Sequence, residues 1–450
     1  MIAIGKKEIS FYAIVLTGAL LLLIPAFYNG YPLVNSDDGT YIHSGFLPQV
    51  PGDRPIIYGL LLRIFSLNGI SLWIALFVQA ITVSWLLLKI IKTIIYQKTY
   101  LAALAIYCFL AFATSLSWIT SELIPDVCTP IVLMSMYLLL LGKESNWNTF
   151  VLYGIFLAAS GTHISHFVIF MAILLLLFLL KRWLFSTQSS RKIHQTLIIL
   201  AALSLLANFV NSSVYRNSKH IFFMGSLLDK KILKPYLHES CPSKGYKLCQ
   251  YKDEIGDDPN WFIWDQNSPL YKEGGWATTK PEYDAIIKDI LTSPKYLKMF
   301  AGKSALFTWR QLMDFKIGDG NFPFKKDNHV YWAIEQHVPG DIPMYVNAWQ
   351  HQELIIPKLE LPNKIIYIVA GLSLVVIIML FVLKRQRLSG PAFLLLLLTM
   401  LLVLINAWDC ATFSNVIGRY QCRVMWMIPF CAMLLMIQAI QARHQLPDNH

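Results

Sequence analysis

The sequence has too little charge for a water-soluble protein of its size. Asp, Glu, Lys and Arg make up 14% of the 450 residues, whereas hydrophobic residues make up 56%, and the mean hydropathy is +0.50. Soluble domains carry roughly 25% charged residues, so a chain of this composition must place much of its surface in lipid. The composition excludes a soluble enzyme and predicts a polytopic membrane protein.

Several motifs are also absent. The sequence contains no C-x-x-C pair, which argues against a zinc or dithiol site, and no basic stretch interleaved with aromatic residues, so the net charge of +11 does not indicate a nucleic-acid partner. No repeat of fixed period occurs, which disfavours a transporter built from paired halves. The first apolar run lacks a small-residue cleavage site, and we expect it to be retained.

Ten apolar runs are long enough, or nearly so, to cross a bilayer, which takes about 17 to 25 residues. We therefore expect an all-α polytopic membrane protein with about ten transmembrane helices, outward juxtamembrane helices and one mixed, mainly helical, soluble outward domain. The expected spans are residues 10–29, 70–90, 100–118, 128–142, 147–161, 165–182, 195–214, 364–383, 391–408 and 424–441.

Basic residues are unevenly distributed between the two sides of these spans. Because cytoplasmic loops are enriched in Lys and Arg, we expect both termini in the cytoplasm, in a multi-pass protein of a bacterial inner (cytoplasmic) membrane whose large domain is periplasmic. The short outward loops hold only Arg54, Arg63, Arg419 and Arg423. The cytoplasmic side would hold Lys6, Lys7, Lys89, Lys92, Lys98, Lys143, Lys181, Arg182, Arg191, Lys192, Lys384, Arg385, Arg387 and Arg443.

The polar residues concentrate in one long segment. We expect residues 1–214 to form a first transmembrane module with a catalytic outward loop at 29–69, residues 215–363 a soluble periplasmic domain, and residues 364–450 the C-terminal transmembrane helices. Within the soluble segment, residues 280–313 show the periodicity of two amphipathic helices separated at Ser293 and Pro294.

Every short outward loop places ionisable residues at the end of a span. The first loop reads SDDGT and then GDRP, and is followed by IIYGLLLRIFSL, an apolar run too short to span that we expect to lie in the interface as a juxtamembrane helix. Ionisable groups at such depths usually face a cavity or each other. The candidate site residues are Asp37, Asp38, Asp53, Arg54, Tyr58, Glu122, Asp126, His163, His166, Arg419, Tyr420 and Arg423.

Each candidate also has a structural interpretation. Adjacent aspartates beside a glycine are typical of a solvated turn or helix cap, Asp126 fits a cap as well, and interfacial arginines can be snorkelling anchors. Histidines spaced by three are a weak metal signal. A divalent cation shared by Asp38, His163, His166 and Glu122 is one option, although nothing in the sequence requires a cofactor.

Four of the seven cysteines fall on the outward side, where an oxidising compartment would favour disulfides. These four allow three connectivities. The simplest joins Cys241 to Cys249 and Cys410 to Cys422.

The combination of SDDGTYIHSG, GDRPIIYGLLLRIFS, SELIPDV and GRYQCRVMWMIP resembles the polyprenyl-phosphate-sugar-dependent glycosyltransferases of the GT-C superfamily, which includes protein O-mannosyltransferases and the aminoarabinose transferase of lipid A. The resemblance covers about the first 180 and the last 40 residues. The chain departs from the family in lacking its paired prolines and a glycine-rich lysine motif in the middle spans.

The resemblance implies a membrane glycosyltransferase that moves a sugar from a polyprenyl-phosphate donor to a lipid, glycan or protein acceptor on the outward face. Asp37 or Asp38 would be the general base, with Asp37 preferred, and the arginines would hold the departing phosphate. Alternatives are a polysaccharide polymerase or ligase, a transporter or lipid flippase, and a non-enzymatic envelope transport or assembly protein.

Overall fold

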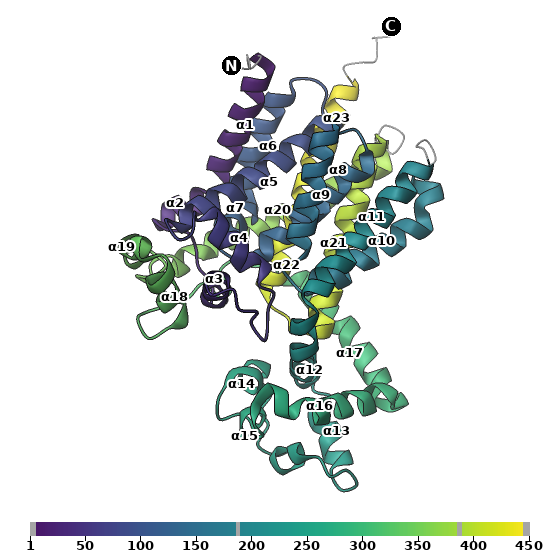
Figure 1. Ribbon diagram of the computed structural model, residues 1–450. Coiled ribbons are helices and arrows are strands. Elements are labelled where there is room, and N and C mark those ends of the chain that lie inside the picture. The colour runs from purple at the N-terminus through teal and green to yellow at the C-terminus, as the bar shows by residue number, and fades with distance from the viewer. Residues whose placement is uncertain (1–5, 186–189, 385–388, 444–450) are drawn as a thin grey trace.

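The computed structural model describes residues 6–185, 190–384 and 389–443. Within these ranges every regular element is a helix, and the only pairing of extended backbone is an isolated parallel bridge between Leu33 and Glu122. The expected all-helical class is therefore confirmed for the described residues. Figure 1 shows a helical bundle with a smaller helical unit at one end.

Within the described ranges, six helical stretches are long and apolar enough to cross a membrane. All ten expected spans fall on helices, but the others are shorter, because α1, α6, α8 and α9 have 17 residues or fewer. The six are α5 (Leu72–Ile94), α10 (Ser165–Leu184), α11 (Ser190–Val210), α20 (Glu360–Lys384), α21 (Gly390–Phe413) and the pair α22 (Gly418–Met425) and α23 (Met427–Arg443). The remaining bundle helices are α1 (Lys6–Leu22), α2 (Ile24–Asn29), α6 (Thr99–Ala113), α7 (Leu116–Thr120), η1 (Pro125–Val127), α8 (Cys128–Leu141) and α9 (Asn146–Ser160).

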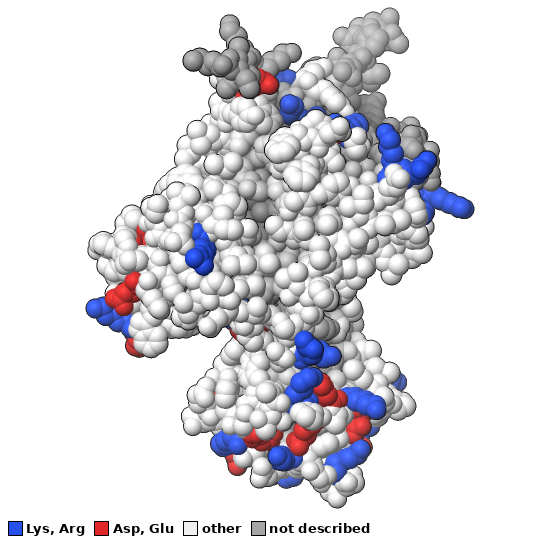
Figure 2. All heavy atoms as spheres, in the orientation of Figure 1, with Lys and Arg blue, Asp and Glu red and all other residues white. Residues whose placement is uncertain are grey.

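Charge on the surface follows this architecture. Figure 2 shows blue side chains around the end of the bundle at which α1 begins, mixed charges on the smaller unit, and few charged atoms on the visible surface between them. An uncharged band between polar ends is what a bilayer requires. Of the basic residues expected in the cytoplasm, Arg385 and Arg387 lie outside the described residues.

The smaller unit has a hydrophobic core of its own. Its buried apolar residues all lie between Ile221 and Tyr296, and a disulfide joins Cys241 to Cys249 with a Cα separation of 5.6 Å. The expected helix boundary at Ser293 is confirmed. The unit comprises α12 (Ser212–Asp229), α13 (Leu233–Ser240), η2 (Lys247–Tyr251), α14 (Pro259–Trp264), α15 (Pro269–Lys272), α16 (Gly275–Thr292) and α17 (Pro294–Met313).

The rest of the expected soluble segment packs elsewhere. Phe324, Ile334 and Tyr345 belong to the main core, and α18 packs against α3 (Asp38–Phe46). Residues 215–363 thus divide between two cores, a division that their shared polar composition does not reveal. The elements of this second part are α18 (His329–His337), η3 (Pro339–Asp341), α19 (Ile342–Asn347) and η4 (Ile356–Leu359).

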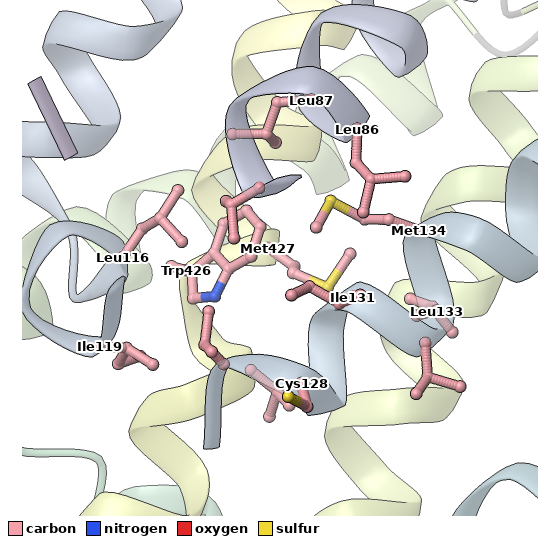
Figure 3. Packing of buried hydrophobic residues seen from close by; sticks show 14 of the residues in the cluster. Leu86, Leu87, Leu116, Ile119, Cys128, Ile131, Leu133, Met134, Trp426 and Met427 are labelled. Carbon is pink, nitrogen blue, oxygen red and sulfur yellow. The ribbon is translucent and has the colours of Figure 1, made fainter. Parts of the chain in front are cut away.

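A dense apolar core supports the start of α23. Leu86 and Leu87 of α5, Leu116 and Ile119 of α7, and Cys128 and Ile131 of α8 surround Trp426 and Met427 (Figure 3). The Trp426 indole N–H donates to the carbonyl oxygen of Arg423 at 3.0 Å. This packing fixes α22, which carries Arg419 and Arg423.

Candidate functional site

The adjacent aspartates Asp37 and Asp38 lie at the start of α3 and differ in burial and in hydrogen-bond partners. Asp38 is fully buried, and its Oδ2 accepts the backbone N–H of Asn35 at 2.7 Å, while its own N–H donates to the Asn35 carbonyl at 3.0 Å. The Asp37 side chain is 28% exposed, and its carboxylate accepts no hydrogen bond from a backbone N–H at the start of α3. The two adjacent carboxylates therefore have different environments, and the backbone at Asp37 is helical.

A close crossing of α3 and α4 (Ile57–Phe65) brings Arg54 to Asp37. A Cβ on Gly45 would lie only 2.1 Å from the Gly59 carbonyl oxygen, so both helices need glycine here. Arg54 Nη1 lies 2.9 Å from Asp37 Oδ1, and its Nε and Nη2 donate to Asp53 Oδ2 at 2.8 and 2.5 Å. Arg54 therefore pairs with both Asp37 and Asp53.

Arg419, at the start of α22, reaches the same carboxylate from the other side. Its Nη2 lies 3.1 Å from Asp37 Oδ2, its Nη1 donates to Asn35 Oδ1 at 2.5 Å, and its Nε lies 3.4 Å from Asp126 Oδ2. Asp37 is thus held between two guanidinium groups. Its two oxygens take one arginine each.

Arg423 completes the network one helical turn further on, since residues four apart share a helix face. Its side chain is fully buried, its Nη1 lies 3.0 Å from Asp126 Oδ1, and its Nε and Nη2 donate to Asn406 Oδ1 at 3.1 and 2.8 Å. A buried guanidinium without such partners would be costly. We call Asp37, Asp53, Arg54, Asp126, Arg419 and Arg423 the arginine–aspartate cluster.

The cluster balances three arginines with three aspartates. Burial alone would raise the pKa of Asp37, but Arg54 and Arg419 outweigh burial and hold that pKa well below its usual range. Among the described residues no cation forms an ion pair with Asp38, and burial raises its pKa well above the usual value. Of the adjacent pair, Asp37 is therefore the carboxyl that its neighbours hold in the ionised form.

Two more expected residues lie beside the cluster. Burial, with a smaller contribution from Asp126, raises the pKa of Glu122 to about 8. Burial, with Arg423 and Arg419, lowers the pKa of His163 to about 3. His163 Nδ1 accepts the backbone N–H of Ser165 at 3.2 Å, so in the neutral ring the proton is on Nε2. At neutral pH the cluster therefore has two uncharged neighbours, the protonated carboxyl of Glu122 and the neutral imidazole of His163.

Other candidates have structural partners instead. The Tyr58 hydroxyl donates to Gln79 Oε1 at 3.1 Å, and the His166 ring lies 2.8 Å from Thr129 Oγ1 and 2.9 Å from the Ala159 carbonyl oxygen. Tyr420 contributes its ring face, which lies 5.4 Å from the Arg419 guanidinium carbon.

The second expected disulfide is wrong. Cys410 and Cys422 are both buried free thiols. Cys410 Sγ lies 3.5 Å from Arg423 Nη2 and therefore faces the cluster. Cys422 lies on α22, where its carbonyl oxygen accepts the Ser115 hydroxyl at 2.8 Å.

The shared cation site is not supported by the side-chain arrangement. In the part of the chain that the structure describes, no group of three His, Cys, Asp or Glu side chains is placed to hold a metal ion. Asp38 uses Oδ2 on backbone and His166 uses both ring nitrogens on protein groups. These residues therefore do not fit a resident divalent cation.

Three asparagine side chains that bind the site residues are not among the candidates predicted from the sequence. Asn35 binds Arg419, Asn406 binds Arg423, and the Asn321 side chain hydrogen-bonds Glu122. Asn406 stands alone in the apolar run LLVLINAW, and an isolated amide in a span is a signal that could have found it. Asn35 and Asn321 lie in polar segments and carry no such signal.

Comparison of the chain with protein-family models, with curated proteins and with solved structures finds no match.

Proposed function

We propose that this protein is a membrane glycosyltransferase that moves a sugar from a polyprenyl-phosphate donor to a hydroxyl of a lipid, glycan or protein acceptor. The observation that carries the proposal is the position of Asp37, a partly exposed carboxylate held between Arg54 and Arg419. A solvated turn needs no such partners, and a helix cap would use the carboxylate on backbone N–H groups. The membrane in question is a bacterial inner membrane, with the site on its periplasmic face and both termini in the cytoplasm.

The arginines are suited to hold the departing phosphate. A guanidinium group forms two parallel hydrogen bonds with a phosphate as readily as with a carboxylate. Arg54 and Arg419 both use N–H groups to bind Asp37. The phosphate of an arriving sugar donor therefore competes with the Asp37 carboxylate for the two guanidinium groups. Phosphate binding therefore releases Asp37 from the groups that hold its pKa low.

The released carboxylate then serves as the general base. In a single displacement, the acceptor oxygen bonds to the anomeric carbon, the bond from that carbon to the phosphate oxygen breaks, and polyprenyl phosphate leaves with the bonding electrons. The acceptor proton passes to Asp37, and the anomeric configuration inverts. A base is most effective when its pKa lies near the working pH, which is why displacement from the arginines matters.

Asp38 has a supporting role in this scheme. Its carboxyl closes the turn from Asn35 and so fixes where Asp37 points. Burial raises the pKa of the Asp38 carboxyl, which disfavours its charged form, and the amide oxygen of an asparagine can accept the same backbone N–H. The two aspartates should therefore respond differently to the same substitution.

The test is transfer of labelled hexoses and pentoses from polyprenyl phosphate to membrane acceptors by purified wild type, Asp37→Asn and Asp38→Asn. Asp37→Asn should lower the rate by about a hundred- to ten-thousandfold, and Asp38→Asn by less than tenfold. Detergent chromatography checks folding. Full transfer by folded Asp37→Asn would refute Asp37 as the general base, whereas no transfer by the folded wild type would refute the transferase and favour an assembly role for this face of the protein.

A further inference from the structure

A cavity lined mainly by charged residues lies where the smaller unit meets the bundle, and it shares no residue with the arginine–aspartate cluster. It has a volume of about 480 Å³, within the roughly 300–1,000 Å³ of small-ligand sites. The end of α12, one face of α17 and the loop after α21 enclose it. Its lining residues are Asp229, Lys230, Lys231, Asp257, Lys303, Phe307, Arg310 and Val416. We call it the Lys230 cavity.

Lys230 is the unusual residue of this cavity. It is fully buried, yet in the described part of the chain no carboxylate lies within ion-pair distance of its Nζ. Its Nζ donates to Ser226 Oγ at 2.6 Å and lies 5.3 Å from the centre of the Phe307 ring. Ser226 Oγ in turn donates to the Thr412 carbonyl, so the hydroxyl is fixed as an acceptor for the ammonium. A buried ammonium with so few partners has donor capacity left for a ligand.

Two more cations of the cavity lie on one face of α17. Lys303 and Arg310 are seven residues apart with Phe307 between them, which is the spacing of a single helix face. Arg310 lies over the Phe307 ring at 4.8 Å, and neither cation forms an ion pair within the described ranges. Both are therefore available to an anion.

The carboxylates of the cavity do not balance these cations. Asp257 is shared between Lys231 at 3.8 Å and Lys234 at 3.4 Å. Asp229 is the one other carboxylate among the lining residues, which include four basic side chains, those of Lys230, Lys231, Lys303 and Arg310. The Lys230 cavity thus has a surplus of positive charge, in contrast to the balanced arginine–aspartate cluster.

The surroundings indicate where the anion comes from. Helix α17 packs along the membrane helix α21, and Leu306, Trp309 and Met313 of α17 are exposed beside the cavity. Exposed apolar and tryptophan side chains next to basic groups are typical of a membrane interface. A phosphate carried on a lipid would find both its anion site and an apolar surface here.

We propose that the Lys230 cavity is a binding site for a phosphate group, held by Lys230, Lys303 and Arg310, with a phospholipid-type headgroup as its source. The proposal does not depend on the transferase activity, because it uses none of the residues of the arginine–aspartate cluster. A soluble phosphate has the same anion chemistry and lacks only the apolar part.

The experiment uses the full chain in detergent and native mass spectrometry to measure binding of dioctanoyl phosphatidate, dioctanoyl phosphatidylcholine, glycerol 3-phosphate and inorganic phosphate. Lys230→Met and Lys303→Met should each weaken phosphatidate binding about tenfold, since each removes one charge-assisted contact. Lys298→Met, on the same helix but outside the cavity, is the matched control and should bind as the wild type does.

Tighter binding of phosphatidate than of glycerol 3-phosphate and inorganic phosphate confirms that the phosphate comes from a lipid. If glycerol 3-phosphate binds as tightly as phosphatidate, the phosphate site is confirmed and its lipid source is overturned. The site itself is overturned if phosphatidate and the soluble phosphates all fail to bind, or if Lys298→Met loses as much affinity as Lys303→Met. Lys303 is only partly buried, so its variant keeps the test valid if Lys230→Met does not fold. Arg419→Ala should keep this binding, which separates the cavity from the donor site.

Discussion

Replacing Arg423 with methionine should destabilise the protein strongly, because the substitution leaves Asp126 buried with a weaker partner. The Arg423 side chain is 0% exposed and that of Asp126 is 4% exposed. Breaking a buried ion pair by removing one partner costs about 3–5 kcal/mol. Arg419 Nε remains 3.4 Å from Asp126, so we expect the lower end of that range, together with the loss of two charge-assisted bonds to Asn406.

The assay is unfolding in mixed detergent micelles, followed by tryptophan fluorescence, for the wild type, Arg423→Met, Asp126→Asn and the double variant. Each single variant should lose about 3 kcal/mol. The double variant should lose at least about 1 kcal/mol less than the sum, because neighbours in one network are not additive.

Arg182→Met provides the control, since Arg182 is exposed and such substitutions usually change stability by less than about 0.5 kcal/mol. If Arg423→Met matches this control, or if the two cluster substitutions are simply additive, the cluster is not an interdependent charge network and the site loses its structural basis.

Three further predictions follow from particular residues. The pKa of Glu122 is raised from 4.5 to about 8, so between these values the folded state binds more protons than the unfolded state, and the free energy of unfolding should fall as the pH rises. Glu122→Gln should remove this pH dependence of the free energy of unfolding, measured between about pH 5 and pH 8. An unchanged pH dependence would contradict the burial of Glu122. Replacing Cys241 and Cys249 with serine should destabilise the smaller unit by about 2–3 kcal/mol, as the closure of a short loop implies, with protease resistance of that unit as the readout and unaltered resistance as the contrary result. Single cysteines introduced into residues 215–363 should react with impermeant maleimides from the periplasmic side only, and labelling from the cytoplasm would reverse the proposed orientation.

The sequence was informative where a short-range pattern decides the structure. The turn at Ser293 separates two helices as predicted, and Cys241 and Cys249 are eight residues apart and form the disulfide. The run from Ile57 is a nine-residue helix, too short to span. In each case the signal lies within about twenty residues and depends little on tertiary packing.

Pairing within the site could not be predicted in the same way. The ionisable loops do converge, but which oxygen of Asp37 meets which arginine depends on the glycine crossing of α3 and α4 and on the rotation of α22. The division of residues 215–363 between two cores has a similar cause, because a polar composition does not say against which surface the apolar residues of a segment pack.

The balance of charge in the cluster leads to a last prediction, in which two properties of one variant change in opposite directions. Two guanidinium groups in a partly buried site would repel each other strongly if left alone, and Asp37 occupies the position between Arg54 and Arg419 that a donor phosphate would take. Asp37→Asn removes this competitor, so polyprenyl phosphate should bind about tenfold more tightly, while sugar transfer falls because the base is gone. Binding of sugar-free polyprenyl phosphate, measured by native mass spectrometry beside the transfer assay, separates the two effects. If Asp37 only shapes the loop, both binding and transfer should weaken together, and that outcome would refute the assignment of Asp37 as both the internal counter-ion and the base.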